Sequence, residues 1–191
     1  MVKKEIPIDR IWWRNVQPGE FYNIERYPQI EGGGGSLYIE IPNSMVDSTL
    51  DFLDSPGANV DELPVITIEA RVIGDPTVSG PIEFHRKQGS RMRIARQNRQ
   101  QSSSQRHPAW TERYGFPTAP DNVRNTDEAR QYFPEEGLRI FIAKTVTGDY
   151  YAGFTKGHRP PDMKPNHPMW ELYPQGNVVG GVVNANGIRR D

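Results

Sequence analysis

Alternating apolar and polar residues recur in short segments along this chain and predict a mainly β protein. Residues 36–42 (SLYIEIP) would place Leu37, Ile39 and Ile41 on one face of a strand. Residues 65–73 (VITIEARVI) are rich in β-branched side chains, which favour strands. Further strands are expected at residues 8–16, from 81 to 84, at 138–146 and 150–154, and, as shorter pieces, at 170–173 and 178–183. Together these segments predict about seven strands, which is typical of a barrel or an open pseudobarrel.

One or two short helices are expected beside these strands. Apolar residues fall at helical spacing over residues 45–53, which Asn43 or Ser44 would cap and Pro56-Gly57 would end. A second helix is expected at residues 125–132. No segment is repeated, and a chain of 191 residues is long enough for one domain with a hydrophobic core. We therefore expect a single domain over residues 1–191, with a tail rich in proline and glycine from about residue 156.

The composition excludes several classes of protein and site. The chain contains no cysteine, which excludes disulfides, thiolate metal ligands and a cysteine nucleophile, and which fits a reducing compartment. No apolar run approaches the ~18 residues of a transmembrane helix, so no membrane partner is expected. Glu5 and Asp9 interrupt the N-terminal segment, which does not resemble a secretory signal. The sequence therefore predicts a cytoplasmic protein.

Positive charge is concentrated in residues 84–113. This segment contains eight basic residues, seven of them arginine, and one acid, Glu112, so its net charge is +7. The whole chain has 23 basic and 24 acidic residues, which leaves a net charge of −8 for all other positions. Arginine pairs bidentately with phosphate or guanine, and the asparagine and glutamine residues interleaved here can pair with adenine. The segment is typical of a sequence-reading nucleic-acid binder, although a solvated, disordered surface loop has the same charge pattern.

Four consecutive glycines, Gly32 to Gly35, precede the strand expected at residues 36–42. Glycines permit a close approach between the backbone and a ligand, but they suit an ordinary flexible connector equally well. They do not form a P-loop, because no Gly-Lys-Ser/Thr follows them. Tyr22, Tyr27 and Tyr38 lie beside them as candidates for contact with a ligand. The tryptophans are expected in the core or at its rim, with base stacking as the alternative; they are Trp12, Trp13, Trp110 and Trp170.

Two short motifs resemble halves of nuclease sites. His85-Arg86-Lys87 matches the HxK half of a phospholipase-D-type motif, but Met92 stands near where that chemistry needs an aspartate. Asp162-Met163-Lys164 matches the D-x-K half of a Mg²⁺-dependent nuclease site, with Asp149 as a conceivable partner carboxylate. Prolines flank that motif, which favours a loop. The four histidines show no metal-ligand spacing, so no metal site is expected.

The order of these segments resembles a known family. A glycine-rich arm leads into SLYIEIP, and NSMVDSTLDFL, VITIEARVIG, PIEFHRKQGSRMRIARQNR, LRIFIAKT and YYAGFT follow in turn. Over roughly residues 8–155 the chain is similar to the plant-B3-like DNA-recognition domains of type II restriction endonucleases. These include the N-terminal effector-binding domain of the EcoRII-like enzymes and the C-terminal domain of the BfiI-like enzymes. Most of the resemblance lies in two segments: the glycine run that leads into SLYIEIP, and the basic stretch that follows PIEF.

The resemblance implies a fold and a mode of binding. The fold would be a seven-stranded, B3-like pseudobarrel that holds double-stranded DNA through its major groove with two arms. The N-arm would fall at residues 26–38 and the C-arm at residues 85–99. The residues implied for DNA binding are Arg26, Tyr27, Gln29, Gly34, Gly35, Ser36 and Tyr38 in the N-arm, and His85, Arg86, Lys87, Gln88, Arg91, Arg93, Arg96, Gln97, Asn98 and Arg99 in the C-arm.

The expected function is target or effector recognition for a type II restriction endonuclease of a restriction-modification system. The domain would have no active site and no cofactor of its own. Cleavage and Mg²⁺ would belong to a covalently linked nuclease domain. Two alternatives stay open: a small Mg²⁺-dependent nuclease using Asp149, Asp162 and Lys164, and a protein-interaction β-barrel whose basic loop binds an acidic partner.

Overall fold

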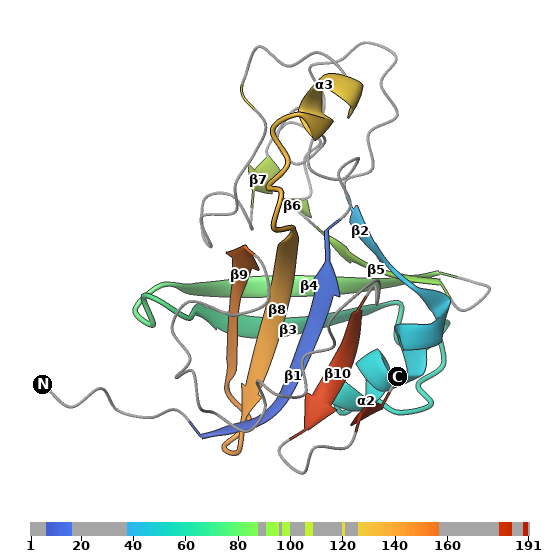
Figure 1. The fold of residues 1–191 in the computed structure, drawn as a ribbon. Helices are drawn as coiled ribbons and strands as arrows, with labels where there is room; N and C mark the ends of the chain where they lie inside the picture. The colour runs from blue at the N-terminus through green and yellow to red at the C-terminus, as the bar shows by residue number, and fades with distance from the viewer. Residues whose placement is uncertain are drawn as a thin grey trace, which may run out of the picture.

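Strands make up most of the described structure (Figure 1). The computed structural model describes residues 7–16, 38–87, 91–95, 97–99, 106–108, 120, 126–156, 180–184 and 189–190. A 3-10 turn and two short helices are present: η1 (Asn43–Met45), α2 (Val46–Phe52) and α3 (Thr126–Arg130). The strands are β1 (Ile8–Asn15), β2 (Tyr38–Ile41), β3 (Val65–Val72), β4 (Ser79–Lys87), β5 (Arg91–Ala95), β6 (Gln97–Arg99), β7 (Arg106–Pro108), β8 (Leu138–Thr145), β9 (Tyr150–Lys156), β10 (Gly180–Asn184) and β11 (Arg189–Arg190). Among the described helices, none is long and apolar enough to cross a membrane.

Nine strands form one open, curled sheet in the order β11-β10-β1-β8-β9-β3-β4-β5-β2, and β6 pairs with β7 apart from it. The prediction of a mainly β fold is confirmed. The predicted count of seven strands is wrong, since the described residues alone form eleven. The main reason lies in the basic segment, whose backbone pairs with other strands instead of standing free. Residues 91–95 join the main sheet as β5, residues 97–99 pair with residues 106–108, and the two-residue β11 adds a further edge.

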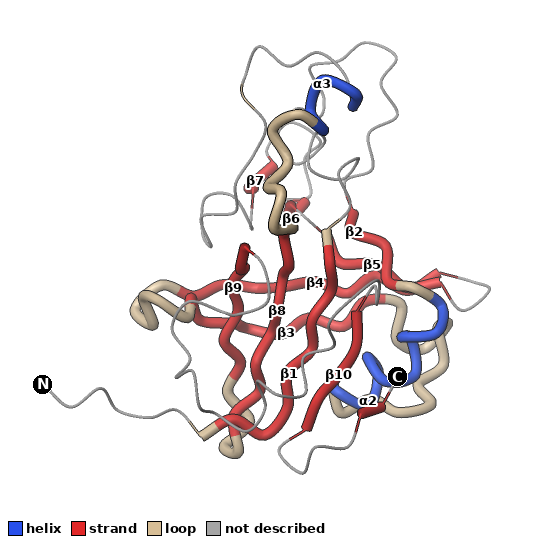
Figure 2. The backbone as a smooth tube through the Cα atoms, viewed as in Figure 1, coloured by secondary structure: helices blue, strands red, loops and turns tan. Residues whose placement is uncertain are grey.

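The sheet curls into two layers that cross at a steep angle (Figure 1). One layer contains β9, β8, β1 and β10, and the other contains β3, β4, β5 and β2. They join at one corner, where residues 70–72 of β3 run parallel to residues 150–152 of β9. Helix α2 lies on the side away from this corner and contacts β10 and β1 (Figure 2). The result is a half-barrel closed partly by a helix.

The core fills the space between the two layers. In β3, Ile66, Ile68 and Ala70 are buried while the residues between them are exposed, as the alternating sequence predicts for a strand with one face in solvent. Every residue of β8 is buried, so this central strand is covered on both faces. The hairpin that joins β8 to β9 turns at Gly148, where a φ of +86° favours glycine. The sequence predicted this hairpin correctly.

Trp12 and Trp13 point to opposite faces of β1. Trp12 lies in the core between the layers, 6.0 Å from the ring centroid of Phe84 in an edge-to-face contact. Its indole Nε1 donates a hydrogen bond of 2.9 Å to Thr49 Oγ1 of α2. Trp13 belongs to a second cluster on the other face of the layer and lies 4.3 Å from the guanidinium of Arg139. Both rings are buried, so neither is exposed for base stacking. Trp110 and Trp170 fall outside the described residues.

Candidate nucleic-acid interface

The outward face of β4, β5 and β2 carries the described part of the basic segment. On the inward face, Phe84 pairs with Ile94 and Ile94 pairs with Ile39, and all three side chains are almost fully buried. Because side chains alternate across a strand, the next residues along each strand face away from the core. These residues form one row across three strands, His85 on β4, Arg93 on β5 and Glu40 on β2.

The cations of this face differ in how tightly they are held. His85 Nε2 lies 2.9 Å from Glu83 Oε2, two residues earlier on β4, and both side chains are about one-quarter exposed. Arg93 is half-buried between His85 and Glu40. Arg91 is exposed at the start of β5, where its Cα lies across from that of Lys87. Among His85, Arg91 and Arg93, whose side chains the structure describes, Arg91 is therefore the most exposed to solvent.

Arg86 is directed to the other side of β4. Its Cα pairs with that of the buried Met92, and its guanidinium donates a 2.6 Å hydrogen bond to the backbone oxygen of Ala58. The backbone NH of Arg86 also donates to Pro64 O at 2.8 Å. Both bonds fasten the chain between α2 and β3 to the end of β4. To reach a base, the Arg86 side chain would have to leave this contact.

The start of β2 links the two expected arms. Tyr38, the last residue of the predicted N-arm, pairs with Ala95, which lies inside the predicted C-arm. Residues 97–99 of the C-arm form β6, which lies beside β4. The other expected contact residues, including the glycine run, lie outside the described residues; they are Arg26, Tyr27, Gln29, Gly34, Gly35, Ser36, Gln88 and Arg96.

These positions span the length of β5. Arg91 and Ala95 stand at its two ends, four residues apart, which at a rise of about 3.3 Å per residue is roughly 13 Å. Tyr38 therefore lies at the Ala95 end of β5, and Lys87, the last residue of β4, lies at the Arg91 end. We name the outward face of β4, β5 and β2 the basic strip. It follows one edge of the sheet, because β2 is the last of the described strands in the sheet order.

Two acids of the basic strip, Glu40 and Glu83, were not among the candidates from sequence. Glu83 contacts His85 on the same strand. Residues two positions apart on a strand lie on the same face, so the sequence pattern could have indicated this contact. Glu40 lies next to Arg93 only because β2 pairs with β5 in this register. Residues 40 and 93 are far apart in the sequence, and no local pattern predicts their pairing.

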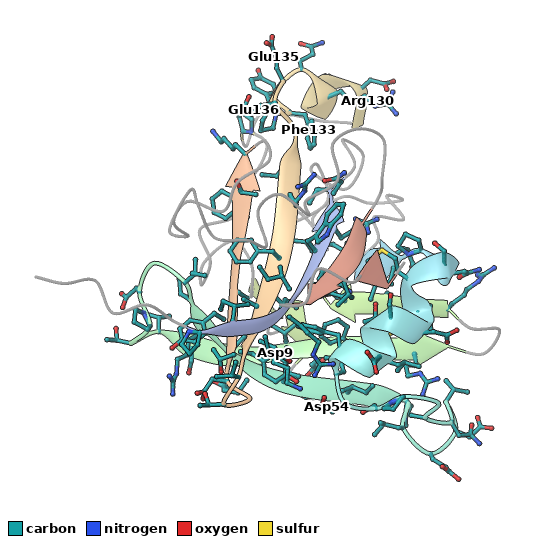
Figure 3. The ribbon with its side chains drawn as sticks, turned by 60° about the horizontal axis from the view of Figure 1, so that its bottom comes forward. Asp9, Asp54, Arg130, Phe133, Glu135 and Glu136 are labelled. Carbon is teal, nitrogen blue, oxygen red and sulfur yellow. The ribbon has the colours of Figure 1, made fainter. Side chains whose placement is uncertain are left out.

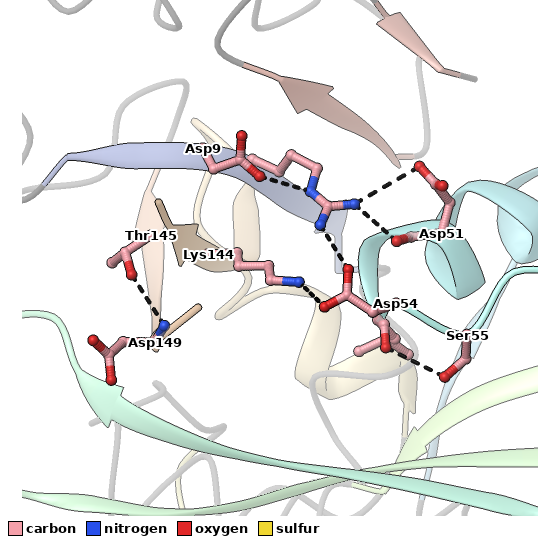
Figure 4. Close-up of polar contacts among 9 residues, drawn as sticks. Asp9, Asp51, Asp54, Ser55, Lys144, Thr145 and Asp149 are labelled. Atoms are coloured by element: carbon pink, nitrogen blue, oxygen red, sulfur yellow. Dashed lines mark hydrogen bonds and ion pairs between the residues drawn. The ribbon is translucent and has the colours of Figure 1, made fainter. Parts of the chain in front are cut away.

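A second polar cluster fastens α2 to the sheet (Figure 4). Asp54, just after α2, accepts a 2.9 Å hydrogen bond from Arg10 Nη2 of β1 through Oδ1 and contacts Lys144 Nζ of β8 through Oδ2. Arg10 also donates to Asp9 at 3.0 Å and to the backbone oxygen of Asp51 at 2.8 Å. The hydrogen bond from Lys144, followed by that from Arg10, holds the pKa of Asp54 below its usual value. Since Arg10 and Lys144 are already bound to the carboxylates of Asp9 and Asp54, this cluster is structural and does not offer a site for a further anion.

The carboxylate of Asp149, proposed for the nuclease alternative, belongs to the β8–β9 turn. Its Oδ2 accepts a 2.9 Å hydrogen bond from Thr147 Oγ1, and its Oδ1 lies 3.9 Å from Arg71 Nη2. Asp162 and Lys164 lie outside the described residues. In the described ranges, no three histidine, aspartate or glutamate side chains gather in a way that would hold a metal ion. Asp149 therefore has a structural role in its turn.

An acidic segment lies at the far end of the domain from Asp9 and Asp54 (Figure 3). It follows α3 and includes the exposed Glu135 and Glu136, while Phe133 packs against the core and anchors it. Carboxylates repel phosphate, so this segment is not a candidate for DNA contact.

The chain matches no protein-family model, no curated protein and no solved structure. The resemblance of its motifs to plant-B3-like domains therefore stays a hypothesis, and the functional argument depends on the residues and geometry of the basic strip.

Proposed function

We propose that this chain is a sequence-specific binding domain for double-stranded DNA, with the architecture of a B3-like pseudobarrel and two arms that enter the major groove. It would serve as the target or effector-binding domain of a cytoplasmic type II restriction endonuclease. In this role it needs no active site and no metal of its own, since a linked nuclease domain would cleave. The sequence resemblance and the charge distribution both motivate this proposal.

One observation supports the proposal most directly. The pairing of Tyr38 with Ala95 joins the end of the N-arm to the C-arm at the edge where the order of described strands ends. Two segments that are distant in sequence thus meet, and the basic strip between them carries His85, Arg91 and Arg93. An edge ribbon of two antiparallel strands has the width that the major groove admits. Arginines on such a ribbon can contact phosphates at its rim and base edges at its centre.

Selection from random duplexes, followed by binding measurements at several salt concentrations, tests the proposal. We expect one preferred sequence, bound at least about 10³-fold more tightly than random DNA. The logarithm of the binding constant should fall with the logarithm of salt concentration, by about 0.9 per phosphate neutralised. A slope near zero would contradict DNA binding and favour the protein-interaction barrel. Cleavage of a plasmid in Mg²⁺ by this chain alone would favour the nuclease alternative.

Matched arginine variants test the placement of the site. Arg93→Ala should reduce the preference for the selected duplex by about 5- to 150-fold, the range for one base-reading side chain. Arg71→Ala removes the same charge from β3, where the guanidinium contacts Tyr151 and Asp149. It should leave the preference unchanged. If Arg93→Ala weakens binding to selected and random duplexes by the same factor, as Arg71→Ala is expected to do, the basic strip does not read bases.

A further inference from the structure

Glu40 is the acid at the β2 end of the row that His85 and Arg93 form on the basic strip. It is exposed, while its neighbours Ile39 and Ile41 on β2 are buried in the core. Its Cα is the direct partner of Arg93 across the antiparallel β2–β5 pair. Residues directly opposite each other in such a pair have Cβ atoms about 4.5–5.5 Å apart. The side chains of Glu40 and Arg93 therefore leave the same face of the ribbon as direct cross-strand neighbours.

The position of this pair at the sheet edge matters for access. Among the strands that the structure describes, β2 comes last in the sheet order, so β2 and β5 together form the ribbon at this edge. A two-stranded ribbon enters the major groove with its outward side chains toward the base edges. Glu40 and Arg93 stand near the middle of this ribbon, where β2 spans residues 38–41 and β5 spans residues 91–95.

The two side chains present complementary hydrogen-bonding groups. In the major groove, a G·C pair displays two acceptors on guanine, N7 and O6, followed by one donor, the N4 amino group of cytosine. Arginine offers two parallel donors, and an ionised glutamate offers only acceptors. An adjacent arginine and glutamate thus match the order of groups on that base-pair edge. Neither an A·T nor a T·A pair displays the same order.

We propose that Glu40 is a specificity-determining residue, which accepts a hydrogen bond from the N4 amino group of a cytosine while Arg93 contacts the guanine of the same or the adjacent base pair. This inference rests on the proposed function and adds that the recognised sequence contains a G·C pair read by β2 and β5. A carboxylate repels the phosphates of every duplex equally, so it lowers affinity for random DNA. At this position the Glu40 carboxylate therefore contributes to sequence preference and not to overall affinity.

The test compares the full chain with two glutamate variants on selected duplexes. Glu40→Gln keeps the shape of the side chain, but the amide offers donors as well as an acceptor and loses the charge. At one G·C position of the selected site, the preference of Glu40→Gln for G·C over other base pairs should be about 10-fold smaller than that of the unaltered protein. This loss lies toward the lower end of the range for one base-specific contact. Glu69→Gln makes the same change on the same outward face, two strands from β5, where the carboxylate accepts a 2.7 Å hydrogen bond from Ser79. It should leave the preferred sequence unchanged.

Modified DNA makes the test specific for the N4 amino group. N4-methylcytosine at the same position replaces the hydrogen that faces the major groove with a methyl group. It should weaken binding of the unaltered protein by about 10-fold and have little further effect on Glu40→Gln, because coupled changes at one contact are not additive. Thermal unfolding should show that both variants stay folded, since both glutamates are exposed.

The other outcomes separate the two proposals. If Glu40→Gln increases affinity equally for selected and random duplexes and keeps the preferred sequence, Glu40 only neutralises charge and the inference is wrong. The inference is also wrong if Glu69→Gln relaxes the same base position. If the unaltered protein selects no sequence at all, the proposed function itself is wrong.

Discussion

Replacing Asp54 with asparagine removes a carboxylate that two cations share. Asp54 Oδ1 lies 2.9 Å from Arg10 Nη2, and Oδ2 contacts Lys144 Nζ, so this one side chain links α2 to β1 and β8. The residue has a φ of +54°, a left-handed conformation that asparagine and aspartate both tolerate. Asp54→Asn therefore changes the charge and leaves the backbone preference almost unaltered.

The exposed fractions of the Asp54 and Lys144 side chains determine how much stability the substitution removes. The Lys144 side chain is only 7% exposed, whereas that of Asp54 is 63% exposed and well screened by water. Exposed pairs contribute up to about 1 kcal/mol, and removal of one partner from a fully buried pair costs about 3–5 kcal/mol. Lys144 keeps the Tyr150 ring, whose centroid lies 5.5 Å from its Nζ. We therefore expect Asp54→Asn to lower the free energy of unfolding by about 1–2 kcal/mol at pH 7.

Denaturant and thermal unfolding at pH 7 measure this loss. For a chain of this size, it corresponds to a decrease in Tm of about 2–8 °C. Asp51→Asn is the control, because Asp51 Oδ2 lies 3.8 Å from Arg10 Nη1 and Arg10 keeps its bond to the Asp51 backbone oxygen. It should cost less than about 0.5 kcal/mol. If Asp54→Asn is no more destabilising than Asp51→Asn, the buried Lys144 does not depend on Asp54.

The pH dependence provides a second check on the same cluster. The pKa of Asp54 is lowered in the folded protein, chiefly by its hydrogen bond from Lys144. Its contribution is therefore fully present above the unfolded pKa of about 3.9 and is lost as the pH falls through the lower folded pKa. The difference in unfolding free energy between the unaltered protein and Asp54→Asn should be constant from pH 7 to 5 and shrink below about pH 4. A difference that stays unchanged at pH 3 would show that the charge of Asp54 is not its source.

Three further substitutions test the packing that positions the basic strip. Arg86→Ala should destabilise the fold by about 1.5–3 kcal/mol, the range for a charged hydrogen bond, and leave the preferred DNA sequence unchanged in a selection experiment. Gly180→Ala would place a Cβ 2.7 Å from the backbone oxygen of Trp13, so thermal unfolding should reveal a cost of about 1–3 kcal/mol. Thr49→Val would leave the buried indole NH of Trp12 without its acceptor, and denaturant unfolding should show a loss of about 1–3 kcal/mol.

Local patterns predicted the elements of this fold well. The strand expected at residues 65–73 is β3, and the hairpin expected across residues 147–149 joins β8 to β9. The helix expected at residues 45–53 is η1 followed by α2. In each of these segments, alternation, helical spacing or turn residues within about ten positions decide the conformation. These local patterns were reliable because the buried positions in the structure recur at the same spacing as the apolar residues in the sequence.

The partners of these elements were not predictable in the same way. A strand pattern states which face is apolar but not which other strand will pair with it. The Arg10–Asp54 contact joins residues 44 positions apart, and Lys144 lies 90 positions from Asp54. Likewise, the family resemblance implied that Arg86 contacts DNA with the other C-arm residues, but its inward register opposite Met92 and its bond to Ala58 depend on the loop after α2.

The position of β1 in the sheet has a consequence for synthesis of the chain. β1 pairs with β8 on one side and β10 on the other, through residues 139–145 and 180–184. A ribosome that adds about 5–20 residues per second therefore takes on the order of ten seconds or more to supply the second partner. During that interval Ile11, Trp12 and Trp13 lack at least one of the two strands that flank β1 in the finished sheet. Until β10 is synthesised, these residues offer a hydrophobic segment to which molecular chaperones can bind.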